Sequence, residues 1–159
     1  GADEIVQKAL AGQNNDGNNT VRGGDRDDIL IAGLGDDRLL GGDGDDTYRY
    51  TRGDGQDVIE DTRGFDRLEV IGYRPDEVRV ERFSDDRNDL IVTFENEDDI
   101  LIIRNAVIDV LTFSDGTTWT RETLLDIATA IGSDTDDLLI GTAGDENYRA
   151  GFGNDIVID

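Results

Sequence analysis

The amino-acid sequence predicts an all-β fold of short stacked strands, and two observations support this prediction. The first is a repeat of nine residues that places glycine, aspartate and a large apolar residue at fixed positions. The second is the charge, because 38 acidic residues stand against 15 basic ones and leave a formal net charge of −23 on 159 residues. Charge of one sign at this density repels itself in a compact chain, so we expect folding to require cations from solution.

The repeat begins with four gapless units of nine residues between Asn14 and Arg49. Tyr50 and Thr51 are an insertion, and two weaker units then cover residues 52–69. The frame disappears after this point and returns over residues 132–158. The eighth residue of each of the first six units is large and apolar: Val21, Leu30, Leu39, Tyr48, Ile59 and Leu68. Scattered surface turns of an unrelated β-protein would not keep one frame over four consecutive units.

The chemistry of one unit suits a metal-binding turn followed by a strand. Glycine tolerates positive φ and close backbone approach, so the first six residues can form a tight turn with carbonyl oxygens pointing inward. The acidic sixth residue closes that turn. Calcium prefers about six to eight hard oxygen ligands, which carbonyls and carboxylates supply. The last three residues form a short strand whose middle side chain points inward, and one such strand buries too little to be stable alone.

These units resemble the nonapeptide G-G-x-G-x-D-x-U-x of the RTX (repeats-in-toxin) haemolysin-type calcium-binding repeat proteins, where U is a large apolar residue. The resemblance implies a right-handed parallel β-roll, a calcium-bound nonapeptide solenoid with two units in each turn. It also implies that each ion lies between a unit and the second unit after it. The expected pairs are Asp28 with Asp46, Asp46 with Asp66, Asp37 with Asp57, Asn19 with Asp37, and Asp137 with Asp155.

The resemblance further implies that several calcium ions bind within the turns. The side chains expected to bind them are Asn19, Asp28, Asp37, Asp46, Asp57, Asp66, Asp137 and Asp155. The glycines expected to shape the metal sites are Gly23, Gly24, Gly33, Gly35, Gly41, Gly42, Gly44, Gly53, Gly55, Gly64, Gly151 and Gly153.

Between the two sets of repeats, the periodicity changes. Alternating apolar residues over 77–83 and 89–95, and an apolar run over 100–103, predict antiparallel strands. The pair Asp115–Gly116, flanked by strand formers, predicts a hairpin.

A short helix is expected after this hairpin, from a Thr120 N-cap through Ala130. The whole stretch, which includes the sequence FSDGTTWT, resembles the haemolysin-type calcium-binding-related region that adjoins RTX repeats.

We therefore expect four segments. They are an N-terminal cap helix or linker over 1–13, with an amphipathic stretch at 5–10; an RTX β-roll over 14–69; antiparallel β-structure plus a short capping helix over 70–131; and the start of a second, truncated roll over 132–159. A tandem array of such units is favoured over the alternative, a single roll with a cap at each end.

Composition argues against several functions. The chain has no Cys, His or Met, so thiolate or imidazole zinc sites and Ser/His or Cys/His nucleophile pairs cannot form. An acidic surface does not suit nucleic acid, and no membrane or glycan contact is evident. We expect no enzyme activity. A carboxylate-pair glycosidase is the alternative, and it is disfavoured because the acids follow the repeat frame.

The expected function is that of a calcium-binding structural module in a secreted or cell-surface RTX protein. By resemblance, it folds on calcium binding outside the cell and aids type I secretion, with calcium ions and neighbouring repeats as its partners. The alternative is an extender or ligand-binding module of a calcium-dependent surface adhesin. An exposed aromatic patch that includes Trp119 would favour this alternative.

Overall fold

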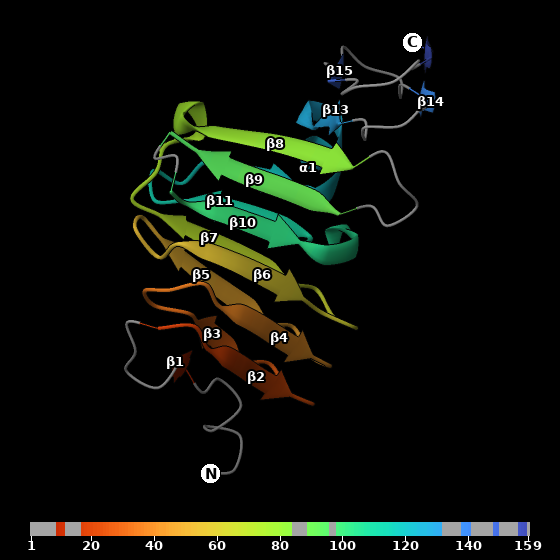
Figure 1. Ribbon diagram of the computed structural model, residues 1–159. Coiled ribbons are helices and arrows are strands. Elements are labelled where there is room, and N and C mark those ends of the chain that lie inside the picture. The colour runs from red at the N-terminus through yellow and green to blue at the C-terminus, as the bar shows by residue number, and fades with distance from the viewer. Residues whose placement is uncertain are drawn as a thin grey trace.

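The computed structural model describes residues 9–11, 17–83, 89–95, 98–131, 138–140, 148–149 and 156–158. These residues form mostly short strands (Figure 1). The strands of the first repeats are β1 (Ala9–Ala11), β2 (Thr20–Gly24), β3 (Ile29–Ile31), β4 (Arg38–Gly42), β5 (Thr47–Thr51), β6 (Gln56–Glu60) and β7 (Arg67–Ile71).

Successive strands of the repeats alternate between two sheets. One sheet has the order β1-β3-β5-β7 and the other has the order β6-β4-β2, with further strands added at the end of each. Every pairing among these strands is parallel. Two nine-residue units thus complete one turn of the coil, and the expected all-β parallel β-roll is confirmed.

The core lies between the two sheets and contains at least one apolar side chain from each of the strands β2 to β7. The six apolar residues at the eighth position are all buried, with exposed fractions of 6% or less: Val21, Leu30, Leu39, Tyr48, Ile59 and Leu68. The inserted Tyr50 is also buried and extends β5 to Thr51. The insertion therefore adds a second inward side chain to this strand without breaking the coil.

Residues 70–131, here called the cap segment, continue both sheets beyond the roll. Its elements in chain order are the 3-10 helix η2 (Pro75–Glu77), β8 (Val78–Phe83), β9 (Leu90–Phe94), β10 (Ile100–Ile103), the 3-10 helix η3 (Arg104–Ala106), β11 (Val110–Phe113), β12 (Thr118–Thr120), α1 (Arg121–Ile127) and β13 (Thr129–Ile131). The pairs β8–β9, β9–β10 and β11–β12 are antiparallel, as the sequence predicts.

The cap segment is joined to the roll through parallel pairing. Strand β10 pairs with β6, and β11 pairs with β7. Figure 1 shows the resulting stack, in which β2, β4 and β6 are followed in order by β10, β9 and β8. The cap segment therefore covers the last turn of the roll, where apolar side chains would otherwise face solvent.

Two helix predictions need correction at their ends. Thr120 caps α1 as expected, since its hydroxyl accepts from the Thr123 backbone N–H at 3.2 Å. The helix ends at Ile127, however, and residues 129–131 form β13, which pairs with the open edge of β8. At the N-terminus, Ala9–Ala11 form β1 on the edge of β3, so the last two residues of the helix expected over 5–10 are strand. Residues 5–8 lie outside the described residues.

The returning repeats are represented by three short strands. Strand β14 (Leu138–Ile140) pairs in parallel with β16 (Ile156–Ile158), and β15 (Tyr148–Arg149) pairs with β13. Leu138 lies opposite Ile156, an offset of 18 residues that equals the offset between Thr20 and Arg38 in the first roll.

Candidate metal centres

The acidic sixth residues of the repeats stack into a ladder beside each sheet. On the first ladder, the backbone N–H of Asp28 donates to Oδ1 of Asp46 at 2.8 Å, and that of Asp46 donates to Oδ1 of Asp66 at 2.9 Å. On the second ladder, the N–H of Asn19 donates to Asp37 at 2.6 Å and the N–H of Asp37 donates to Asp57 at 2.8 Å. The structure thus brings together the four pairs expected in the first roll.

The second carboxylate oxygen of three of these acids has no hydrogen-bond partner. Oδ2 of Asp37, Asp46 and Asp57 is buried and unpaired. An unpaired buried oxygen costs about 1–3 kcal/mol, and more when it carries charge. A cation between the turns would remove that cost, so these oxygens fit calcium.

Burial shifts the acid–base equilibria of the same side chains. Loss of solvation raises the pKa of Asp46 to about 6 and that of Asp57 and Asp66 to about 7. Hydrogen bonds from backbone amides oppose this shift, whereas neighbouring carboxylates add to it. The pKa of Asp37 is raised as well, chiefly by burial. Without a cation, the folded ladders therefore hold protons on these carboxyls up to a higher pH than free aspartates would.

Comparison with known families supports the same assignment. A family model for the RTX calcium-binding nonapeptide repeat matches four copies, over residues 13–48 and 127–157. The chain carries RTX calcium-binding repeats. A search of curated proteins found no match. RTX repeats of this kind bind calcium and are a structural, non-catalytic unit.

The RTX ladders extend beyond the residues that the family model matches. The match to the first repeats ends at Tyr48, yet Asp57 and Asp66 hold the same hydrogen-bonded positions as the earlier acids. Loss of the glycine pattern after the insertion therefore does not end the stacking of turns.

Glycine is required in the RTX turns where backbones of successive turns meet. Gly44 has φ of 126°, and a Cβ there would lie 2.5 Å from the carbonyl carbon of Arg26 in the turn below. Positive φ is also found at these predicted site glycines: Gly24, Gly33, Gly35, Gly42, Gly53, Gly55 and Gly64. A Cβ on Gly23 would collide with the carbonyl oxygen of Gly41 in the neighbouring turn, and a Cβ on Gly41 would collide with the side chains packed beside it. Asp137, Asp155, Gly151 and Gly153 lie outside the described residues.

Asp109 of the cap segment continues the first ladder, and the sequence analysis missed it. The backbone N–H of Asp66 donates to Oδ2 of Asp109 at 2.9 Å. Nη2 of Arg121 lies 3.1 Å from Oδ1 of Asp109 and also donates to the carbonyl of Val107 at 2.8 Å. A local signal exists, because Asp109 directly precedes a strand, as four of the sixth-position acids do: Asp28, Asp37, Asp46 and Asp66.

Asp61 is a second residue that the sequence analysis missed. It stands at the first position of the unit over 61–69, where Gly23 and Gly41 stand in earlier units. One carboxylate oxygen each from Asp46, Asp61 and Asp66 lie within 4.8 Å of one another.

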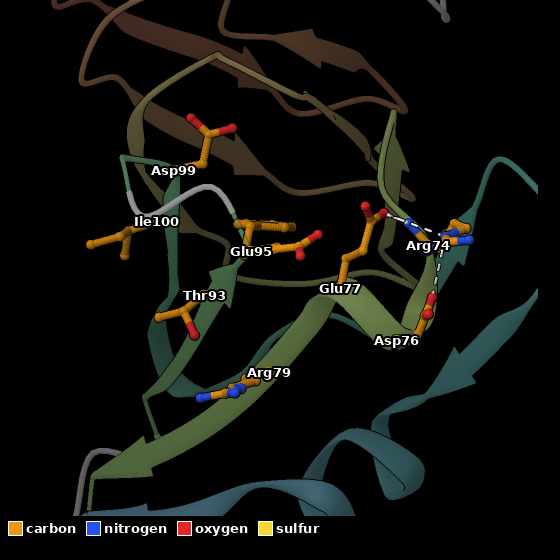
Figure 2. A pocket seen from close by; sticks show the side chains of 9 residues that line it. Arg74, Asp76, Glu77, Arg79, Thr93, Glu95, Asp99 and Ile100 are labelled. Atoms are coloured by element: carbon orange, nitrogen blue, oxygen red, sulfur yellow. Dashed lines mark hydrogen bonds and ion pairs between the residues drawn. The ribbon is translucent and has the colours of Figure 1, made fainter.

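A polar hollow of about 500 Å³ lies outside the ladders, where β8, β9 and β10 meet. Figure 2 shows Glu77 and Asp76 close to Arg74, to whose Nε both are ion-paired, at 3.8 and 3.4 Å. Hydrogen bonding from the Arg74 backbone and from Arg52 lowers the pKa of Glu77. A glycosidase general acid needs a raised pKa, so this hollow gives no support to carboxylate-pair hydrolysis.

Among the described residues, no helix combines the length and the apolar composition needed to cross a membrane.

Proposed function

We propose that calcium binding folds this RTX module outside the cell and thereby aids its type I secretion. The observation that carries this proposal is the set of buried, unpaired Oδ2 atoms on stacked aspartates. The turns can be packed without a cation only if these carboxylates are protonated or left unpaired. In calcium-poor cytosol the chain therefore stays unfolded and passes through the secretion channel in that form.

Calcium would bind between each turn and the turn stacked on it. The proposed side-chain ligands of the described roll are Asn19, Asp28, Asp37, Asp46, Asp57 and Asp66. Turn carbonyl oxygens would complete a shell of about six to eight oxygens. With the expected pair Asp137 and Asp155, about five ions would add about ten positive charges, which offsets a large part of the net negative charge.

Because the sites exist only in the folded coil, the free energy of calcium binding becomes free energy of folding. Sites of extracellular modules bind calcium at about 10⁻⁴–10⁻³ M, which matches the calcium concentration outside cells but not inside them. The switch is thus set by compartment, and folding outside the cell would prevent the chain from returning through the channel.

The tandem layout also remains our proposal for the chain. The offset of 18 residues between β14 and β16 supports a second roll that begins after the cap segment. In this layout, each cap segment ends one roll and β13 starts the pairing of the next.

The adhesin alternative receives no support from Trp119. Its ring is half-buried and packs edge-on against Phe113, with ring centroids 4.7 Å apart. It does not form the exposed aromatic patch that would mark a ligand-binding surface.

A calcium titration followed by circular dichroism and Trp119 fluorescence tests the proposal, with magnesium as the control ion. We expect a largely unfolded chain in chelator that gains β-structure cooperatively at about 0.1–1 mM calcium. In parallel, Asp46→Asn should shift the midpoint to higher calcium, whereas Asp25→Asn, at an exposed site, should leave it unchanged. A chain that is fully folded in chelator would overturn the proposal.

A further inference from the structure

The turn that contains Asp61 differs from the turns below it in its first residue. Earlier units that contribute to the same ladder begin with Gly23 and Gly41, whereas this unit begins with an aspartate. The glycine supplies no side chain to a metal site, but Asp61 supplies a carboxylate. This carboxylate approaches Asp46 and Asp66, so that one oxygen from each of the three lies within 4.8 Å of the other two.

Asp61 is held in place from both sides. The hydroxyl of Tyr48 donates a hydrogen bond to Oδ2 of Asp61, and the backbone N–H of Thr62 donates to Oδ1 at 2.6 Å. Tyr48 is fully buried in the core of the roll. The phenol therefore fixes the carboxylate from inside the fold. A freely rotating surface aspartate would lack such a contact.

The three carboxylates share a space that the side chain of Asp46 faces. Oδ2 of Asp46 is buried and has no hydrogen-bond partner, and Asp46 itself has an exposed fraction of 0%. A Cβ built on Gly41 would collide with Oδ2 of Asp46, Oδ2 of Asp61 and the hydroxyl of Tyr48. The absence of a side chain at Gly41 thus leaves open the place toward which these oxygens point.

Three carboxylates that converge, one of them with an unpaired buried oxygen, are unfavourable without a cation. The charged groups that raise the pKa of Asp46 are all aspartates, and Asp61 has the largest effect among them. A divalent ion would neutralise two of the three negative charges, and calcium affinity rises with the number of charged ligands in a site.

We propose that Asp61 is a third carboxylate ligand, which makes the site between the turns of Asp46 and Asp66 the tightest calcium site of the described roll. The inference rests on the proposed function and adds to it a residue outside the repeat pattern. Tyr48 is a positioning residue for this site, because it acts through Asp61. The ion at this site would bind first during folding and hold the last two turns of the ladder together.

Calcium binding to the full chain, measured by isothermal titration calorimetry, tests the inference. Wild type should show one binding step at least about tenfold tighter than the others. Asp61→Asn should weaken that step by about tenfold or more without changing the weaker steps. Asp25→Asn, which removes an exposed acid from another turn, is the matched control and should change none of the steps.

Two further variants keep the test decisive if Asp61→Asn folds poorly. Asp61→Gly installs the residue found at this position in earlier units, so the turn remains compatible with the roll, and it should lose the tight step. Tyr48→Phe should weaken the same step to a smaller extent and reduce terbium emission excited through tyrosine, because the phenol lies beside the proposed ion.

The outcomes separate the inference from the proposed function. If wild type binds no calcium, the proposed function fails. If wild type binds calcium and both Asp61 variants retain all of its binding steps, the third ligand is refuted while the proposed function stands.

Discussion

The backbone N–H of Asp66 donates to the carboxylate of Asp109, 2.9 Å away in space and 43 residues later in the chain. The same contact joins successive acids within the roll, so the cap segment extends the ladder by one position. At that position a guanidinium, from Arg121, lies against the carboxylate. The ladder thus ends in an ion pair between side chains.

Arg121→Gln should destabilise the calcium-bound chain by about 1 kcal/mol, since the pair is partly exposed and its charge is screened by solvent. The number of bound calcium ions should not change. Urea unfolding in saturating calcium measures the first effect and calorimetry the second. Arg63→Gln removes an arginine that is 81% exposed and lies 3.7 Å from Asp43, and it should be nearly neutral. A lower calcium stoichiometry in Arg121→Gln would contradict this account of the end of the ladder.

The inward apolar residues should determine the stability of the calcium-bound roll. Leu39→Ala removes a side chain that is 1% exposed and should cost about 2–5 kcal/mol. Leu34→Ala makes the same chemical change at a site that is 49% exposed, and its effect should stay below about 1 kcal/mol. Thermal unfolding in saturating calcium compares the two variants, and equal losses would argue against the assigned core.

The glycines of the turns should matter for backbone reasons. Gly44→Ala would place a Cβ against the backbone of Arg26 at a positive φ, and should cost more than about 1 kcal/mol. Gly17→Ala meets no heavy atom within 4 Å and provides the control. The calcium midpoint of folding is the measurement, and it should rise for Gly44→Ala alone.

Acid should partly replace calcium. The pKa of Asp57 and Asp66 rises from 3.8 to about 7 on folding, and that of Asp46 rises to about 6. A group whose pKa is raised in the folded state stabilises the fold fully below pH 3.8 and loses this effect as pH rises through 6 to 7. Circular dichroism in chelator should therefore show a gain of β-structure as pH falls from 8 to 5. A signal that does not change over this range would count against buried carboxylates as the cause of apo unfolding.

Calcium binding by the folded chain should weaken in acid. Protons compete with calcium for the same carboxylates, so the apparent affinity of the folded chain for calcium should fall as pH falls below about 7. Titrations at pH 8 and at pH 6 make this comparison.

The repeat frame, together with the RTX resemblance, predicted the roll and its ladders. The frame fixes the positions of the sixth-position acids and the eighth-position apolar residues, and the resemblance, with two units in each turn, implies the pairs Asp28–Asp46 and Asp37–Asp57. Asp109 could not be found in this way, because it reaches the ladder through a connection without the repeat. Asp61 was missed because it occupies a position that the repeat pattern assigns to glycine.

Strands β1 and β13 form where helix was expected, because of tertiary structure. Residues 9–10 and 129–130 belong to stretches that favour helix by local pattern, yet the two strands lie beside open strand edges, of β3 and of β8. Pairing with such an edge satisfies backbone groups along the strand and outweighs weak helix propensity. Sequence reasoning could not place these edges before the topology was known.

A crystal structure of the chain grown with ample calcium tests the central claim most directly. The account predicts anomalous-scattering peaks between successive turns, with a calcium ion about 2.3–2.6 Å from Oδ2 of Asp46. Turns without metal, or ladder aspartates that point into solvent, would contradict it.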